Sequence, residues 1–290
     1  MPKKLILVTG ANGQLGQELF RISEEIKDLK MIFTDVEQLD ITNNRQVRLA
    51  ITDMKPFAVV NCAAYTAVDK AESEPEQAAN INVAGAGSLA AACAINDTLL
   101  IHISTDYVFG GKGNTPYTED NQPDPQGVYA TTKAQGEQAV ISSGCDYAII
   151  RTSWLYSVFG NNFVKTMIRL GQEREELKVV NDQIGSPTNA RDLAKAIVQI
   201  LLHHASEEPM REIFHFANDG AVSWFDFATE IMSLAKLNCK VLPIPTSDYP
   251  VPAPRPAYSV MDTTKIQKQF NIEIAGWKES LRLCIGELKK

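Results

Sequence analysis

Short apolar runs alternate with longer amphipathic segments through the first half of the chain. Strands are predicted at short, mainly apolar runs, at residues 5–8, 31–35, 58–62, 99–103 and 147–151. Continuous apolar runs are typical of strands buried on both faces, as in a parallel sheet covered by helices. The pattern therefore predicts an α/β fold with a doubly wound, Rossmann-like parallel sheet.

The alternation is looser after about Trp154. Helices are predicted at residues 162–173, 191–204 and 223–237, and short strands at 177–180 and 213–216. Residues 243–256 contain six prolines and show no periodicity. A long loop inside a compact protein is more often functional than idle.

These patterns suggest a division into two parts. We expect residues 1–154 to form a dinucleotide-binding domain, to which residues 184–215 return. Residues 155–183 and 216–290 then form a smaller, partly interleaved C-terminal substrate-binding lobe.

Composition excludes several classes of protein. The 290 residues are 44% apolar and 22% charged, which is ordinary for a globular protein in water. A net charge of −7 without a Lys/Arg block argues against nucleic acid as a partner. Five cysteines without a C-x-x-C pair suit reduced thiols. No apolar run approaches the roughly 18 residues of a membrane span, and the first strand begins too early for a secretory signal. We expect a cytoplasmic protein without a membrane partner.

A glycine-rich turn follows the first predicted strand. Residues 9–16 read TGANGQLG, and a helix is predicted directly after them. In a dinucleotide site, Gly10 permits the tight turn, Gly13 lets the backbone approach the pyrophosphate, and Gly16 lets the helix pack closely. The N–H groups at the start of the helix then face the phosphates.

An acid ends the second predicted strand. Asp35 lies where a carboxylate accepts hydrogen bonds from the adenosine ribose, and it would repel a 2′-phosphate. On the residues alone NADH is favoured over NADPH, although a merely solvated acid at a strand end is an equally good interpretation. Asp40 and Ile41 are candidates for the adenine site.

A phenol and an ammonium group are spaced to meet on one helix. Tyr129 and Lys133 are four residues apart in a helix that is predicted to start near Gly127. A nearby ammonium is expected to lower the pKa of the phenol and make it a better proton donor. Thr105 and Asp106 follow the strand at 99–103, at the edge of the sheet where ligands bind.

With these residues in place, the chain resembles the extended short-chain dehydrogenase/reductase family over its whole length. The segments that carry the resemblance are VNCAAYTAVDKAESEPEQA (60–78), STDYVFGG (104–111), VYATTKAQGEQ (128–138), RTSWLY (151–156), NNFVKTM (161–167), VVNDQIGSPT (179–188) and PAPRPAYSVMDT (252–263). The similarity is to the branch that reduces the C4 keto group of a dTDP-sugar, dTDP-4-dehydro-6-deoxy-L-mannose, by hydride transfer from NADPH or NADH.

The resemblance implies roles for individual residues. Tyr129 would protonate the C4 oxygen, Lys133 would hold the nicotinamide ribose and tune Tyr129, and Thr105 would orient the same oxygen. Asp106 and Trp154 would contact the sugar. The coenzyme would be bound by Gly10, Gly13, Gln14, Leu15, Gly16, Asp35, Asp40, Ile41, Ala64, Tyr65, Thr66, Tyr129 and Lys133.

Arg255 is the predicted cation for the diphosphate. It stands between Pro254 and Pro256, whose φ angles are fixed, so the loop is ordered before a ligand binds. A guanidinium suits bidentate recognition of a diphosphate.

The chain departs from its relatives at one predicted metal position. Some relatives bind Mg²⁺ through glutamates at a dimer contact, and Glu18 matches one of those positions. Arg191 stands where a second acid is expected, which argues against a metal-bridged dimer. No metal site is predicted, and a homodimer without metal stays open.

Three other functions are known on the same fold and are alternatives for this chain. A sugar-nucleotide 4,6-dehydratase usually carries Glu directly after the Thr-Asp pair, where this chain has Tyr107. A nucleotide-sugar 4-epimerase uses the same Tyr-Lys pair. A non-catalytic NAD(P)-binding subunit, resembling the regulatory subunit of methionine adenosyltransferase, is the alternative outside enzymes. The complete set of hydroxyl, phenol and ammonium favours an enzyme.

Overall fold

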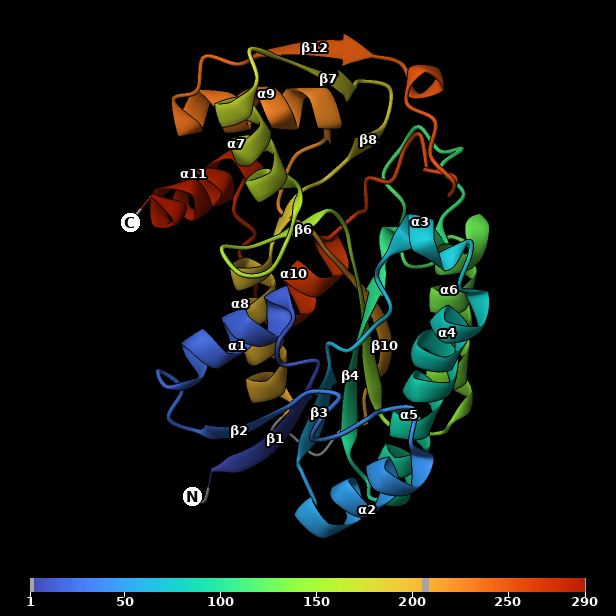
Figure 1. Ribbon diagram of the computed structural model, residues 1–290. Helices are drawn as coiled ribbons and strands as arrows, with labels where there is room; N and C mark the ends of the chain where they lie inside the picture. Colours follow the sequence, from blue (N-terminus) through green and yellow to red (C-terminus); the bar gives the residue numbers. More distant parts are fainter. Residues whose placement is uncertain (1–2, 205–208, 290) are drawn as a thin grey trace.

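The computed structural model describes residues 3–204 and 209–289, and within them the central element is a six-stranded parallel sheet (Figure 1). Its strand order is β10-β5-β4-β3-β1-β2. The bounds are Lys4–Thr9 for β1, Leu29–Thr34 for β2, Ala58–Asn61 for β3, Leu99–Thr105 for β4, Tyr147–Thr152 for β5 and Arg211–Phe216 for β10. Every neighbouring pair in this sheet is parallel, so the predicted fold class is confirmed.

Alternate residues of each strand enter two separate cores. Ile6 and Val8 of β1 pack in one core, whereas Leu7 between them packs in the other. This is the two-residue period of a strand that is buried on both faces. The sequence shows it as a continuous apolar run because neither face meets water.

Helices cover both faces of the sheet, as in a doubly wound fold. Helices α1 (Gln14–Ser23), α8 (Ala190–His203) and α10 (Thr264–Phe270) contribute to the first core. Helices α2 (Asn44–Met54), α5 (Ala86–Ile95) and α6 (Gly127–Ser142) contribute to the second. Figure 1 shows the two groups on opposite sides of the strands.

The helical stretch before β4 is not uniformly α-helical. It consists of α4 (Pro75–Ala79), a π-helical segment (Asn80–Gly85) and α5. A Cβ on Gly136 of α6 would overlap the Asn82 carbonyl oxygen, so the two helices approach closely at this segment. The Asn82 side chain accepts a hydrogen bond from the Tyr65 backbone N–H at 2.9 Å and donates one to the Tyr65 carbonyl at 3.2 Å. The π-helical segment thereby fixes the loop after β3, in keeping with the frequent use of π-turns at functional sites.

The stretch 75–95 is long and apolar enough to span a membrane by composition alone, and half of its most apolar window is buried. Its α5 part packs against α2, α6 and β4. This is the environment of a core helix.

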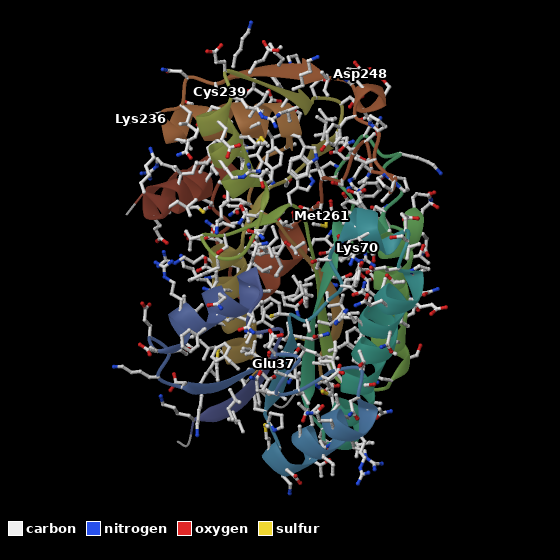
Figure 2. The ribbon with its side chains drawn as sticks, in the orientation of Figure 1. Glu37, Lys70, Lys236, Cys239, Asp248 and Met261 are labelled. Carbon is white, nitrogen blue, oxygen red and sulfur yellow. The ribbon has the colours of Figure 1, made fainter. Side chains whose placement is uncertain are left out.

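A third core lies beyond the carboxyl edge of the sheet, at the top of Figure 1. It is formed by α7 (Phe163–Glu173), α9 (Trp224–Ala235), α11 (Trp277–Leu288) and the parallel pair β7 (Glu176–Val180) and β12 (Lys240–Ile244). Lys236 and Cys239, labelled in Figure 2, lie at this end, and Glu37 lies near the end of β2. Strand pairs β6 (Leu155–Tyr156) with β9 (Thr188–Asn189), and β8 (Ile184–Gly185) with β11 (Val222–Ser223), join the two parts.

The chain crosses between the two parts more often than a simple division into halves would require. Strand β10 and helix α8 belong to the central sheet and its first core. Ile266 and Phe270 of α10 pack in the same core, although they fall within the predicted substrate lobe. The proposed domain boundaries stay a prediction.

A buried ion pair connects the sheet to α6. Arg151 of β5 donates to both carboxylate oxygens of Glu137, at 2.9 and 2.7 Å, and both side chains are at most 2% exposed. Ser104, the neighbour of Arg151 in β4, donates to the same carboxylate at 2.5 Å. A bidentate geometry with a third hydrogen bond offsets much of the cost of removing these charges from water.

We expect Glu137→Ala to destabilise the protein by about 3–5 kcal/mol, because it leaves the Arg151 guanidinium buried without a counter-ion. Urea denaturation measures this change. Glu173→Ala is the matched control, since its partner Arg169 is 60% exposed and such pairs contribute at most about 1 kcal/mol. Equal effects of the two substitutions would contradict this account of the pair.

Candidate active site

The glycine-rich turn lies at the point where the strand order of the sheet reverses. The chain leaves β1 to form β2 on one side and returns to form β3 on the other. Ligands of open α/β sheets bind in the crevice at such a point. Gly10 adopts a φ of +68°, and a Cβ there would lie 2.5 Å from the Ala63 backbone nitrogen. A Cβ on Gly16 would lie 2.5 Å from the Gly10 carbonyl oxygen, so only glycine fits at both positions.

A first cavity, of about 460 Å³, opens beside this turn. The predicted coenzyme residues that line it are Gly10, Gly13, Asp35, Asp40, Ile41 and Ala64. Asp35 accepts a hydrogen bond from the Asn12 N–H in the turn at 2.8 Å and another from the Val36 N–H at 2.8 Å. The carboxylate is therefore fixed at the mouth of the crevice.

A second cavity, of about 550 Å³, adjoins the first, and Gly13, Cys62 and Ala64 line both. Most of the remaining predicted residues line this second cavity: Gln14, Leu15, Thr66, Thr105, Asp106, Tyr129, Lys133 and Trp154. Three predicted residues do not line it: Gly16, Tyr65 and Arg255. Gly16 lies beneath the turn, and Tyr65 is buried, with its hydroxyl donating to Glu74 at 2.8 Å. These two lie outside both cavities.

Helix α6 presents Tyr129 and Lys133 to this cavity. The Lys133 ammonium donates to the Ile103 carbonyl at the end of β4, at 2.7 Å. Burial lowers the pKa of Lys133 to about 8, although Glu137 opposes this shift. Burial raises the pKa of Tyr129 to about 12, against the lowering effect of a hydrogen bond with Thr105.

The expected lowering of the Tyr129 pKa by Lys133 is therefore wrong for this structure. Loss of solvent around the phenol outweighs the nearby charges, and the ammonium bonds to a backbone carbonyl instead. The phenol is therefore protonated near neutral pH, as an ordinary phenol with a pKa of about 10 is, and it is a weaker acid than its spacing from Lys133 predicts.

Thr105 and Asp106 form the floor of the cavity at the end of β4. The Thr105 hydroxyl donates to one Asp106 oxygen at 3.1 Å and accepts from the Tyr107 N–H at 3.2 Å. Burial raises the pKa of Asp106 to about 6, against the effect of hydrogen bonds with Ser259 and Thr105. The other carboxylate oxygen has no hydrogen-bond partner within residues 3–204 and 209–289. A buried acceptor of this kind is suited to a ligand hydroxyl.

An aromatic wall closes the side of the cavity that faces the second lobe. Trp154 adopts a φ of +47° and stacks on Trp224, with ring centroids 3.5 Å apart and planes within 8°. Trp224 lines the cavity and was not predicted from the sequence. Its only signal was its place directly after the helix cap Ser223, which does not reveal where the indole points.

Arg255 lies in a third cavity of about 660 Å³ between α7, β7, β12 and the proline-rich loop. Trp224 lines both this cavity and the catalytic one. The Arg255 guanidinium lies 6.0 Å from the centre of the Tyr107 ring, which is 5.6 Å from the Tyr129 ring. It also pairs with Asp69 at 2.8 Å, so the arginine is held in place rather than free.

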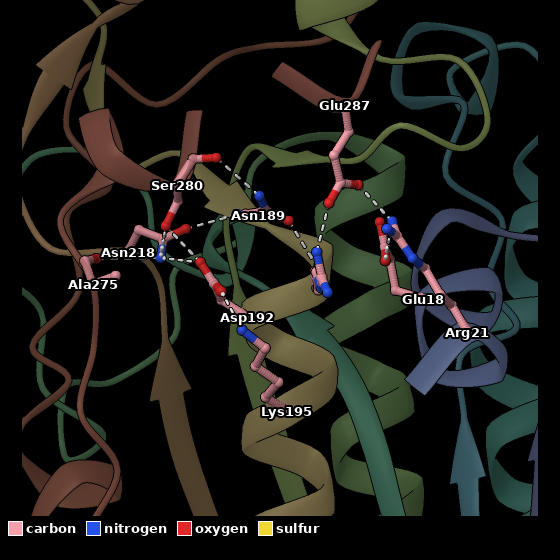
Figure 3. Close-up of polar contacts among 10 residues, drawn as sticks. Glu18, Arg21, Asn189, Asp192, Lys195, Asn218, Ala275, Ser280 and Glu287 are labelled. Carbon is pink, nitrogen blue, oxygen red and sulfur yellow. Dashed lines mark hydrogen bonds and ion pairs between the residues drawn. The ribbon is translucent and has the colours of Figure 1, made fainter. Parts of the chain in front are cut away.

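The position considered for a metal is occupied by an ion-pair cluster (Figure 3). Glu18 is buried, accepts from Ser157 at 2.5 Å and lies 3.9 Å from Arg21. Glu287 pairs with both Arg21 and Arg191 at 2.6 Å, which ties α11 to α1 and α8. Among the residues that the structure describes, no group of three or more His, Cys, Asp or Glu side chains could hold a metal ion.

The buried Lys133 makes stability depend on pH. Its folded-state pKa of about 8 lies below the ordinary value of 10.5, so the unfolded chain binds more protons between these values. Stability therefore rises with pH in this window. We expect wild type to gain roughly 1.5 kcal/mol relative to Lys133→Met between pH 8 and pH 9.5.

Urea denaturation at the two pH values measures this gain. The difference between the two proteins removes the contributions of all other titrating groups. A constant difference would mean that Lys133 keeps an ordinary pKa in the folded protein.

Comparison with known proteins agrees with this geometry. The family model described as RmlD substrate binding domain matches residues 3–290. The spore coat polysaccharide biosynthesis protein SpsK of Bacillus subtilis is 41% identical, with 97% of each chain covered. A crystal structure of a dTDP-4-dehydrorhamnose reductase from Clostridium acetobutylicum has a TM-score of 0.93 and 43% identity, covering 99% of this chain and 100% of that one. The dTDP-4-dehydrorhamnose reductase of Bacillus anthracis in complex with NADP has a TM-score of 0.92 and 41% identity, covering 98% and 99%. The chain belongs to the RmlD substrate binding domain family.

Proposed function

We propose that this protein is an NAD(P)H-dependent dTDP-4-dehydrorhamnose reductase, which reduces the C4 keto group of its sugar nucleotide to give dTDP-L-rhamnose. The observation that carries the proposal is the meeting of Thr105, Tyr129 and Lys133 in one cavity next to a dinucleotide crevice. Relatives with about 40% identity over nearly the whole chain have this activity in their names.

The crevice fits a dinucleotide because its backbone approaches closely where a pyrophosphate needs access. Gly10 and Gly13 would face the phosphates, and Asp35 would accept hydrogen bonds from the adenosine ribose. Gln14, Leu15, Ala64 and Thr66 would line the path toward Lys133. A bound nicotinamide coenzyme supplies the hydride for C4. Relatives of known structure bind NADP, and we retain both NADPH and NADH.

Tyr129 would protonate the C4 oxygen as the carbonyl becomes an alcohol. Its raised pKa keeps the phenol protonated at neutral pH, and the developing alkoxide is a much stronger base than the phenolate that remains. Thr105 would direct its hydroxyl to the same oxygen, because it lies within hydrogen-bonding reach of Tyr129. The Lys133 ammonium would stabilise the phenolate and hold the nicotinamide ribose.

Asp106 and Trp154 would contact the sugar ring. The unpaired oxygen of Asp106 is an acceptor for a sugar hydroxyl, and the indole of Trp154 offers an apolar face. Both side chains are held in place, one by Thr105 and the other by Trp224. Gly16 and Tyr65, which lie outside the cavities, would act only by shaping the turn and the loop around the coenzyme.

The adjoining cavity is suited to the nucleoside diphosphate. It meets the catalytic cavity at Trp224, and the charged residues that line it are three cations, Arg174, Lys178 and Arg255, and two acids, Glu176 and Asp248. A chain with a net charge of −7 repels anions in general, so local cations of this kind are needed. Cytoplasmic location and a homodimer stay predictions.

The alternative functions receive no comparable support. Epimerases and the regulatory subunit share the fold, but the relatives with high identity are named reductases. Tyr107 occupies the place of the acid in a dehydratase, and burial raises the pKa of its phenol further.

The purified protein is expected to oxidise NADPH or NADH when dTDP-4-dehydrorhamnose is added, with loss of absorbance at the wavelength of the reduced nicotinamide. Tyr129→Phe is expected to lower turnover about 10²–10⁴-fold, because it removes the general acid. The dissociation constant of the coenzyme should change little, since the ring is retained.

Two results would count against this function. A turnover within threefold of wild type in Tyr129→Phe would remove the tyrosine from proton transfer. Absence of coenzyme oxidation with either nucleotide would remove the reductase activity itself.

A further inference from the structure

Asp69 ties the proline-rich loop to a helix on the other side of the site. It lies in α3 (Val68–Ala71), and its two carboxylate oxygens bind different groups of the loop. One accepts from the Arg255 guanidinium at 2.8 Å, and the other from the Ala253 N–H at 3.3 Å. Figure 1 shows α3 next to this loop, although 186 residues separate Asp69 from Arg255.

The same short segment contacts the start of the catalytic helix. Glu72 directly follows α3 and accepts a hydrogen bond from the Val128 N–H at 2.8 Å. Val128 is the residue before Tyr129. A Cβ on Gly127 would lie 2.7 Å from Glu72 and 3.0 Å from Pro254. The start of α6, the segment around α3 and the proline-rich loop therefore meet at this point.

Arg255 keeps binding capacity after it pairs with Asp69. A guanidinium has five N–H donors in one plane. One terminal nitrogen pairs with Asp69 and the other donates to the Ala253 carbonyl at 3.4 Å, which leaves further N–H donors for a ligand. The Arg255 side chain is 18% exposed and lines two cavities, whereas Asp69 is 43% exposed. Asp69 is therefore the more exposed partner, and Arg255 lines both the cavity of about 660 Å³ and a smaller one that Tyr107 also lines.

We propose that Asp69 is a positioning residue that orders the Arg255 guanidinium for the diphosphate of the substrate. This inference rests on the proposed function, in which Arg255 binds that diphosphate. A free arginine side chain loses much conformational freedom when it binds a ligand, and an arginine held beforehand loses less. The flanking prolines fix the backbone, and Asp69 fixes the side chain.

Competition between Asp69 and the diphosphate for Arg255 would have the opposite effect on binding. If Asp69 only competed with the diphosphate, removing its charge would free Arg255 and tighten binding. The sign of the change therefore distinguishes positioning from competition.

The experiment uses the full-length protein with Asp69→Asn, which retains an acceptor for the Ala253 N–H but loses the charge. Calorimetry with dTDP as the probe, and steady-state kinetics with dTDP-4-dehydrorhamnose, are measured in parallel. We expect the Kd of dTDP and the KM of the sugar nucleotide to rise about 5–20-fold, with kcat and the coenzyme Kd within twofold. Asp146→Asn is the matched control, because it removes one charge from a surface pair with Arg211.

Two further variants separate this inference from the proposed function. Asp69→Glu is expected to recover most of the affinity, because it restores the carboxylate. Arg255→Ala is expected to weaken dTDP binding by itself, and Asp69→Asn should then add nothing in that background.

The measurements test the positioning role of Asp69 and the diphosphate contact of Arg255 separately. Unchanged or tighter dTDP binding in Asp69→Asn overturns the positioning role, as does an Asp69 effect that persists without Arg255. If Arg255→Ala leaves dTDP binding unchanged, Arg255 does not contact the diphosphate, whatever effect the Asp69 variants have.

Discussion

The site depends on the close approach of two backbone segments at the reversal point of the sheet. Gly10 and Ala63 lie so near one another that no side chain fits between them. A row of buried hydrogen bonds fixes the approach: Thr9 donates to Asn61 at 2.8 Å, the Ala63 N–H donates to the same oxygen at 3.1 Å, and the Asn61 amide contacts His102 at 3.0 Å. Burial and the nearby Lys133 hold the pKa of His102 well below its usual range, so the ring is neutral and can accept from Asn61.

Removal of water governs the chemistry of the groups gathered at this edge. It moves the pKa values of Tyr129, Lys133 and Asp106 in the directions that favour their neutral forms. A neutral phenol is a proton donor, and a charge that forms in such a place interacts strongly with its neighbours. The fold thus holds a protonated phenol, Tyr129, near a cation, Lys133. The two groups do not have to be hydrogen-bonded to each other before substrate binds.

The sequence predicted the central sheet well because its strands are buried on both faces and read as uninterrupted apolar runs. It also identified the glycine turn and the helix that carries Tyr129 and Lys133, since both follow from local spacing. The π-helical segment was missed because a local apolar pattern does not distinguish it from an α-helix, and its close contact with Gly136 joins residues far apart in the chain. Trp224, the Asp69–Arg255 pair and the direction of the Tyr129 pKa shift depend on burial and on partners brought together by the fold. Local pattern carries no information on these.

The position of the Trp154 indole makes the shape of the cavity that it lines depend on a residue distant in sequence. The ring rests against Gly185, where an added Cβ would lie 2.6 Å from the indole. Any larger side chain at 185 would displace the indole. A larger residue at 185 therefore requires a smaller one at 154, and homologues are expected to vary at the two positions in concert.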